Sequence, residues 1–172
     1  MTTIALKDNI LACDTQITAD DVKYNCSSKI TIVRNDLVIA GSGDSNEILK
    51  LEKFFREFPD WEENLDKKPK IRASVDCILI SKGKPYTIYK DGFPDPMGHP
   101  FIASGSGWKF AMAGMHLGLS AVDAVKLASE FDVYTNDRIR YINVAELQGS
   151  TKETPKRKRA PSVSKEKART GD

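Results

Sequence analysis

Cysteine, histidine and long hydrophobic runs are all scarce in this chain of 172 residues. Its three cysteines are scattered and none belongs to a CxxC pair, which indicates reduced intracellular thiols rather than a disulfide framework. The two histidines, His99 and His116, are too few and too far apart in sequence to suggest a metal site. No apolar run approaches the ~18–20 residues that span a bilayer, and the first residues lack the basic start and apolar stretch of a signal peptide. We therefore expect a cytoplasmic protein that is neither secreted, membrane-bound nor built around a metal.

Charge divides the chain into two unequal parts. Residues 149–172 hold eight basic and three acidic residues, a net charge of +5, and because the whole chain carries +2, residues 1–148 carry −3. The segment has no aromatic residue and one valine, so it cannot bury enough apolar surface to offset its ordering entropy. We predict a folded domain over 1–148 and a basic, disordered tail over 149–172. The KRKR run at 156–159 would suit phosphate binding or targeting, but a solvated tail is the favoured interpretation, and nucleic acid is expected only through this tail.

The hydrophobic pattern of residues 1–148 predicts short strands and a few helices. Three hairpins with polar turns are predicted, formed by Thr3–Leu6 with Ile10–Cys13, Lys29–Val33 with Leu37–Gly41, and Val75–Ser81 with Tyr86–Lys90. A helix capped by Asp44 or Ser45 and ended by Pro59 follows the second hairpin. The remaining predicted elements are a strand over Phe101–Ser104, a helix over 107–117, a helix capped by Ser120 and a strand over Arg138–Val144. This order favours a layered α+β architecture over alternating βαβ units.

Two glycine-rich turns, Gly41–Gly43 and Gly105–Gly107, do not match a nucleotide-binding fingerprint. Neither continues into GxxxxGK[ST], and Asn46 occupies the position of the third glycine in a dinucleotide-binding turn. Ser42 and Ser106 are not in GxSxG elbows. We therefore expect no cofactor.

The amino terminus carries the most informative chemistry. Methionine followed by a small residue is a substrate for methionine aminopeptidase, so the mature chain is expected to begin at Thr2. An amino-terminal threonine carries its own general base, because its α-amine has a reference pKa near ~7.7–8.0 and is partly neutral at cellular pH. That amine can take the proton of the threonine hydroxyl, directly or through water. The pattern becomes specific only with suitable partners at suitable spacing.

Such partners follow Thr2 along the chain. Asp14 ends a predicted strand, Lys29 lies 15 residues later at the head of the next, and Gly43 lies 14 residues further in a glycine turn. With these, the sequence resembles the β-type subunits of the 20S proteasome and, most closely, the HslV peptidase, both N-terminal nucleophile (Ntn) hydrolases. The motifs that carry the resemblance run in order over most of residues 2–145: Thr2-Thr3-Ile4, Ala-x-Asp-x-Gln at Ala12–Gln16, the lysine-led strand, Val-Ile-Ala-Gly at 38–41, Gly105–Gly107 before an Ala-rich helix, and Asp132–Asn136.

The resemblance implies a four-layer αββα sandwich and a set of catalytic roles. Thr2 would be the nucleophile and its amine the base. Lys29 would lower the pKa of the threonine hydroxyl and keep the amine neutral by like-charge repulsion, with Asp14 fixing its position. The Gly43 N–H would stabilise the oxyanion. Ser106, Asp132 and Thr135 match the family's secondary polar cluster around the terminal amine, although capping and turn hydrogen bonds would explain them equally well.

The resemblance also implies a threonine endopeptidase that acts on peptides or proteins in a homo-oligomeric ring fed by a AAA+ ATPase. One departure bears on the assembly, because residues 59–74 are too short and too polar for the family's long second helix. Two alternatives stay open: an Ntn amidohydrolase acting on a small amide without a degradation chamber, and an inactive Ntn scaffold whose basic tail binds nucleic acid or a partner.

Overall fold

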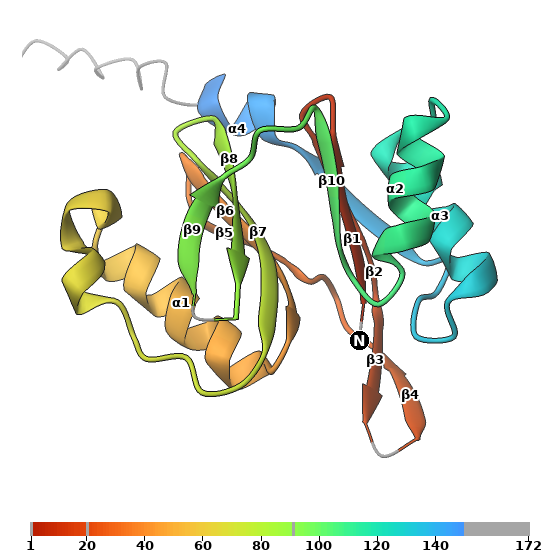
Figure 1. The fold of residues 1–172 in the computed structure, drawn as a ribbon, viewed down its shortest axis with the longest axis horizontal. Helices are drawn as coiled ribbons and strands as arrows, with labels where there is room; N and C mark the ends of the chain where they lie inside the picture. The colour runs from red at the N-terminus through yellow and green to blue at the C-terminus, as the bar shows by residue number, and fades with distance from the viewer. Residues whose placement is uncertain (1, 20, 91, 150–172) are drawn as a thin grey trace, which may run out of the picture.

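The computed structural model describes residues 2–19, 21–90 and 92–149, which are arranged in four layers (Figure 1). Helix α1 (Ser45–Glu57) covers the outer face of one sheet, and the pair α2 (Trp108–His116) and α3 (Ala121–Phe131) covers the outer face of the other. The predicted αββα sandwich is confirmed. The predicted tail lies outside the described residues except for Gly149, the last residue of α4 (Val144–Gly149).

The sheet beside α2 and α3 brings the two ends of the domain together. It has the order β10-β1-β2-β11, and every neighbouring pair is antiparallel. Its strands are β1 (Thr3–Lys7), β2 (Ile10–Asp14), β10 (Phe101–Gly105) and β11 (Ile139–Asn143). Thr3 pairs with Gly105, and Asp14 pairs with Ile139. The start of β1 and the ends of β2 and β10 therefore lie at the same edge of this sheet.

The second sheet is an antiparallel meander of five strands in sequence order. Its strands are β5 (Ile30–Arg34), β6 (Leu37–Gly43), β7 (Val75–Ser81), β8 (Lys84–Tyr89) and β9 (Phe93–Pro96). A separate ribbon of β3 (Gln16–Ala19) and β4 (Val22–Asn25) projects from the end of β2 (Figure 1). Residues 26–29 connect this ribbon with β5, and the contacts of Cys26 with Thr15 and of Lys29 with Asp14 hold this connection next to the end of β2.

Helices α1 and α3 begin where the sequence supplies a side-chain cap. The Asp44 side chain accepts hydrogen bonds from the backbone N–H groups of Asn46 and Glu47 at the start of α1. Ser120 caps α3 through the N–H of Asp123. The chain from Trp61 to Lys67 forms only a 3₁₀ segment, η1, in place of a second long α-helix.

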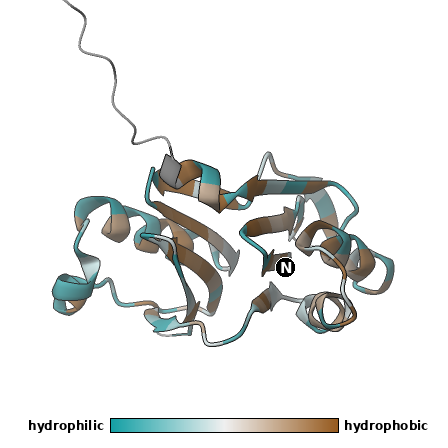
Figure 2. Cartoon of the chain, turned by 90° about the horizontal axis from the view of Figure 1, so that it is seen from above, coloured by the Kyte–Doolittle hydropathy of each residue, from teal (hydrophilic) through white to brown (hydrophobic). Residues whose placement is uncertain are grey.

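Three hydrophobic clusters fill the spaces between the layers, because side chains alternate along each strand. In β6, Leu37 and Ile39 pack beneath α1, whereas Val38 faces the other sheet. In β1, Ile4 lies between the sheets and Ala5 packs against α2 and α3. Figure 2 shows the same division, with hydrophobic strands in the centre and more hydrophilic segments on the outer helices.

The elements that decide the layers were predicted correctly, and the short elements were missed. The three hairpins, the two strands near 101–105 and 139–143, and helices α1, α2 and α3 are confirmed. The hydrophobic pattern contains no separate signal for β3, β4, β9, η1 or α4. Two of these strands lack the features that identify a strand in a sequence. Strand β4 is exposed along its whole length, and β9 contains Pro94 and Pro96 at a sheet edge, where proline is tolerated.

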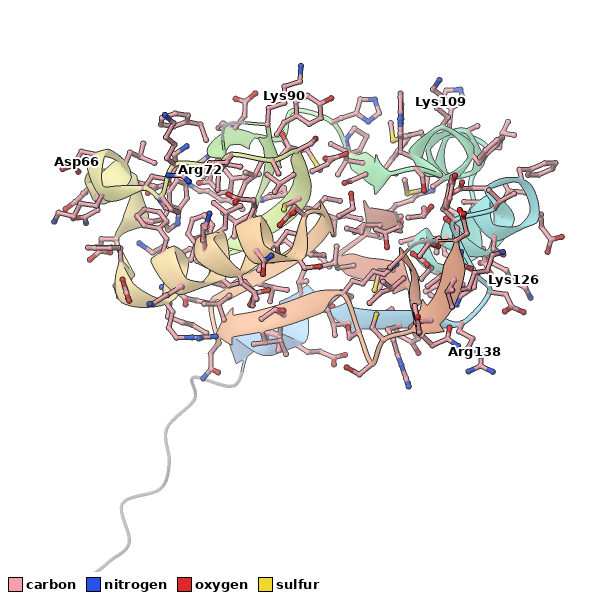
Figure 3. The ribbon with its side chains drawn as sticks, turned by 90° about the horizontal axis from the view of Figure 1, so that it is seen from below. Asp66, Arg72, Lys90, Lys109, Lys126 and Arg138 are labelled. Atoms are coloured by element: carbon pink, nitrogen blue, oxygen red, sulfur yellow. The ribbon has the colours of Figure 1, made fainter. Side chains whose placement is uncertain are left out.

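The outer surface carries charged side chains on every layer. In Figure 3 the labelled residues Asp66, Arg72, Lys90, Lys109, Lys126 and Arg138 point away from the body of the protein. In the part of the chain that the structure describes, no helix is both long enough and apolar enough to cross a membrane.

Candidate active site

Thr2 lies at the amino-terminal end of β1, where residues from both sheets come together. It directly precedes β1, and its neighbours come from the end of β2, the head of β5 and the end of β6. Thr2 is 2% exposed and Asp14 is fully buried. Residues far apart in sequence are therefore packed against the first threonine.

Asp14 is the centre of this arrangement and accepts hydrogen bonds from four groups. The Thr2 hydroxyl donates to its Oδ1 at 3.0 Å, and the Thr3 backbone N–H donates to the same oxygen at 2.8 Å. The Gln16 backbone N–H donates to Oδ2 at 2.8 Å. Because a buried carboxylate is costly unless it is paired and fully hydrogen-bonded, this set of donors stabilises the charge at that position.

Lys29 supplies the fourth partner and the opposite charge. Its ammonium lies 2.9 Å from Asp14 Oδ1 and 3.1 Å from Oδ2, and it also donates to the Gln16 carbonyl oxygen. Its side chain is 10% exposed. The predicted link between Asp14 and Lys29 is thus a nearly dry, bidentate ion pair that holds a positive charge beside the Thr2 hydroxyl.

Gly43 lies across a cleft that opens next to Thr2. The cleft has a volume of about 280 Å³, and Thr2, Lys29 and Gly43 all line it. Gly43 has a φ of +107°, and a Cβ there would lie 2.2 Å from the Ser74 carbonyl oxygen, so only glycine fits. Gly43 and Thr2 therefore line the same cleft.

The three remaining predicted residues form one hydrogen-bonded group on the other side of Thr2. The hydroxyls of Ser106 and Thr135 each donate to Asp132 Oδ2 at 2.6 Å. Two contacts join this group to Thr2 and Thr3. The Ser106 backbone N–H donates to the Thr2 carbonyl oxygen at 2.7 Å, and the hydroxyls of Thr135 and Thr3 are 2.6 Å apart.

Two glycines allow this group to approach the amino terminus closely. Gly105 has a φ of +90°, and a Cβ on it would lie 2.0 Å from the Thr2 carbonyl oxygen. A Cβ on Gly107 would lie 2.2 Å from the Thr3 hydroxyl. The glycines of the Gly105-Ser106-Gly107 turn therefore allow a close contact with Thr2 and Thr3. This explains the glycine-rich turn without a phosphate-binding role.

Sequence reasoning assigned no role to several residues that complete the site. Thr3 contributes both its N–H and its hydroxyl, and Gln16 contributes its N–H and its carbonyl oxygen. Asn136 accepts from the Thr15 N–H at 3.2 Å and donates to Asn25 Oδ1 at 2.7 Å. Asp76 accepts from the Gly105 N–H at 3.2 Å and so ties β7 to the glycine turn. Most of these bonds use backbone groups, which every residue has, so residue types gave no signal for them.

Comparisons with known proteins agree with this geometry at the level of the fold. No protein-family model matches the chain, and no curated protein matches it. Solved structures do match: HslV from Trypanosoma brucei is 21% identical with a TM-score of 0.63, and the alignment covers 82% of this chain and 97% of that one. BPH from Thiobacillus denitrificans is 19% identical with a TM-score of 0.60, covering 82% and 95% of the two chains. The same protein in complex with epoxomicin is 20% identical with a TM-score of 0.59, covering 82% and 96%.

These similarities span nearly the whole length of the matched chains. At this level of identity they establish architecture. The chain therefore has the fold of the proteasome and HslV type of Ntn hydrolase.

Proposed function

We propose that this protein is a threonine peptidase whose nucleophile is the hydroxyl of Thr2. Thr2 becomes the first residue of the chain once Met1 is removed. The observation that carries the proposal is the contact of the Thr2 hydroxyl with a buried Asp14–Lys29 pair beside an open cleft. A structural threonine needs neither a dry ammonium next to its hydroxyl nor a cleft in front of it. The HslV fold supports the same class of enzyme.

The chemistry begins with proton transfer inside Thr2. The free α-amine takes the proton from the hydroxyl, and the Thr2 oxygen attacks the carbonyl carbon of the substrate peptide bond. Lys29 favours the neutral form of this amine, because a second positive charge nearby is repelled by the ammonium that Asp14 holds in place. The Gly43 N–H stabilises the negative charge that develops on the carbonyl oxygen.

Two stages follow: the tetrahedral intermediate collapses to an ester, and water then hydrolyses that ester. The carbon–nitrogen bond breaks, the protonated α-amine gives its proton to the departing amine, and the acyl group remains as an ester on Thr2. A water molecule, deprotonated by the same α-amine, attacks the ester and releases the carboxylic product, while the Thr2 oxygen recovers its proton. Ser106, Asp132 and Thr135 hold the backbone of Thr2 and Thr3 through both stages.

The decisive test compares the mass of the protein with its activity. We expect intact mass spectrometry to show a chain that begins at Thr2, and the protein to cleave fluorogenic peptides. Thr2→Ala is expected to abolish cleavage and Thr2→Ser to leave a part of it. Epoxomicin, which is bound in one of the similar structures, is expected to inhibit the enzyme. An active preparation that retains Met1 throughout would contradict the mechanism.

We propose further that the chain forms a cytoplasmic homo-oligomeric ring that receives protein substrates from a AAA+ ATPase. The alternative, an amidohydrolase for small amides, gains support from η1, which replaces the long second helix with a short 3₁₀ segment. Light scattering coupled to size-exclusion chromatography separates the two proposals. A ring-sized particle supports the peptidase chamber, and an active monomer or dimer supports the amidohydrolase.

A further inference from the structure

The nucleophile and the proposed oxyanion donor belong to different sheets. Thr2 directly precedes β1 of the four-stranded sheet, whereas Gly43 is the last residue of β6 in the five-stranded sheet. Attack on a peptide bond needs both groups at one carbonyl, and a misplacement of about 1 Å can cost about a hundredfold in rate. The reaction therefore depends on what fixes the two sheets relative to each other near Thr2.

Strand β7 carries one carboxylate, Asp76, in a run of apolar residues. Side chains alternate along a strand, and in β7 Cys77 and Leu79 pack beneath α1 while Ile78 and Ile80 face the other sheet. Asp76 belongs to the second set, so its side chain points into the space between the sheets. A carboxylate at this position contributes little to apolar packing, and its hydrogen-bond partner is therefore the feature that explains it.

The partner of Asp76 lies in the other sheet. Asp76 Oδ2 accepts a hydrogen bond from the Gly105 backbone N–H at 3.2 Å, and the Asp76 carbonyl oxygen accepts one from the Ser104 hydroxyl at 3.1 Å. Gly105 is packed directly against Thr2, since a Cβ on this glycine would lie 2.0 Å from the Thr2 carbonyl oxygen. The position of Gly105 therefore sets the position of the Thr2 backbone.

The two residues before Asp76 hold Gly43. Val75 pairs with Gly43 across β7 and β6. The Ser74 carbonyl oxygen accepts a hydrogen bond from the Asp44 N–H at 3.2 Å and would lie 2.2 Å from a Cβ on Gly43. Two extended residues span about 7 Å. One short stretch of backbone thus contacts the proposed oxyanion donor at one end and the support of the nucleophile at the other.

We propose that Asp76 is a positioning residue that, by holding the Gly105 N–H, fixes the distance between the nucleophile and the oxyanion donor. Its hydrogen bond joins the sheet that carries Thr2 to the strand that holds Gly43. Asp76 acts through Gly105 and exchanges no proton with the substrate. This inference rests on the proposed peptidase function and adds a residue to it.

The test compares substitutions that remove the acceptor with one that keeps it. For Asp76→Ala we expect kcat on a fluorogenic peptide to fall by about tenfold to a hundredfold, with KM changed by less than about twofold. Asp76→Leu also lacks an acceptor but suits an apolar strand, so it should show the same loss without a folding defect. Asp76→Asn keeps an oxygen that can accept from Gly105 and should restore most of kcat. The matched control is Ser81→Ala at the other end of β7, which removes the buried hydrogen bond from Trp61 Nε1 and should lower stability without lowering kcat.

A peptide aldehyde reports the alignment of the site directly. The Thr2 hydroxyl oxygen bonds to the aldehyde carbon, its proton passes to the former carbonyl oxygen, and the resulting hemiacetal resembles the tetrahedral intermediate. The corresponding peptide alcohol forms no such bond. In the Asp76→Ala protein, Kd for the aldehyde should rise by about the factor by which kcat falls, while Kd for the alcohol should stay unchanged.

Crystal structures of the variants separate this inference from the catalytic proposal. The distance between the Thr2 hydroxyl oxygen and the Gly43 nitrogen should change in Asp76→Ala and Asp76→Leu and be kept in Asp76→Asn, whether or not peptides are cleaved. An unchanged distance, an unchanged kcat, or a loss in Asp76→Asn or Ser81→Ala as large as in Asp76→Ala overturns the Asp76 assignment and leaves the peptidase proposal standing. A changed distance in a protein that cleaves no peptide overturns the peptidase proposal and supports Asp76 as the residue that spaces the two sheets.

Discussion

The two sides of Thr2 are built from different kinds of groups. The side that meets its hydroxyl is an ion pair, with a fully buried Asp14 and a Lys29 side chain that is 10% exposed. The side that meets its carbonyl oxygen consists of hydroxyls and backbone N–H groups gathered around the half-buried Asp132. A charge beside the hydroxyl changes its chemistry, whereas neutral donors at the carbonyl fix its position. We infer that the first side supplies reactivity and the second supplies alignment.

Removing Lys29 is expected to have the largest effect. Lys29→Ala should abolish turnover as fully as Thr2→Ala, and the double variant should be no worse than either, because the two residues act as one unit. It should also lower the free energy of unfolding by up to about 3–5 kcal/mol, since Asp14 keeps its buried charge without a counter-ion. Peptide cleavage and chemical denaturation measure the two quantities.

The control for Lys29→Ala removes both charges. A double Asp14→Asn, Lys29→Met variant leaves no buried unpaired ion, so it should recover most of the lost stability while remaining inactive. If turnover returned with stability, the pair would be structural and the division of labour between the two sides of Thr2 would fail.

Gly105→Ala should have the next largest effect, through position rather than charge. The new Cβ would lie 2.0 Å from the Thr2 carbonyl oxygen in a backbone conformation with φ of +90°, so Thr2 must move. A displacement of this size is expected to cost about a hundredfold in kcat/KM. Gly98→Ala is the matched control, because a Cβ there has nothing within 4 Å, and it should change neither activity nor stability appreciably. Equal activity in the two variants would show that the exact placement of Thr2 is unimportant.

Thr135→Val is a smaller and more specific change on the alignment side. It keeps the shape of the side chain and removes the hydroxyl that connects Thr3 with Asp132. We expect the free energy of unfolding to fall by about 1–3 kcal/mol, because the Thr3 hydroxyl and Asp132 lose a partner. Turnover should fall only a few-fold, with an unaltered pH profile, and Thr135→Ser should restore it. A loss as complete as that of Lys29→Ala would assign this side a direct chemical role.

The smallest expected effect concerns cysteine reactivity and leaves catalysis unchanged. Burial raises the pKa of the Cys13 thiol, which precedes Asp14 on β2, to about 11, and that of Cys77 to about 12, so both stay protonated at neutral pH. Native protein at pH 8 should therefore be alkylated by iodoacetamide at Cys26, which lines the cleft, and not at Cys13. Peptide mapping of the alkylated protein measures which cysteines react. Rapid labelling of Cys13 would show that solvent reaches the side of Thr2 where Asp14 and Lys29 lie.

The raised pKa values of Cys13 and Cys77 also make the free energy of unfolding depend on pH. Since the folded state holds these two protons more tightly than the unfolded chain, whose thiols ionise near pH 9, the stabilisation is complete below pH 9. It is lost as the pH rises toward 11 and 12. Denaturation midpoints measured from pH 8 upward should fall, and Cys13→Ala should reduce the slope.

Hydrophobic runs, helix caps and charged residues at strand ends were enough to predict the layers and the presence of Asp14 and Lys29 beside Thr2. Nearly continuous apolar runs in β1, β2, β6 and β7 require two buried faces each, and the caps at Asp44 and Ser120 fix where helices α1 and α3 begin. The charges of Asp14 and Lys29 stood out because such residues at strand ends, behind an amino-terminal threonine, form a recognisable pattern. Their contact was predicted from resemblance and is present in the structure.

The assembly of the site depends on strand pairing and helix packing, which the sequence pattern does not reveal. The Thr3 and Gln16 backbone groups reach Asp14, and the Ser106 N–H reaches the Thr2 carbonyl oxygen, only after β1 pairs with β2 and β10. Residues of α1 line the cleft beside Thr2 because this helix packs over β6, and one of them, Glu52, lies 50 positions after Thr2 in the chain. A sequence pattern reveals the local periodicity and the residue types. A backbone N–H group is common to nearly all residues, and the sequence distance between a helix and the residues it packs against varies from fold to fold. These parts of the site are therefore set by packing and sheet register.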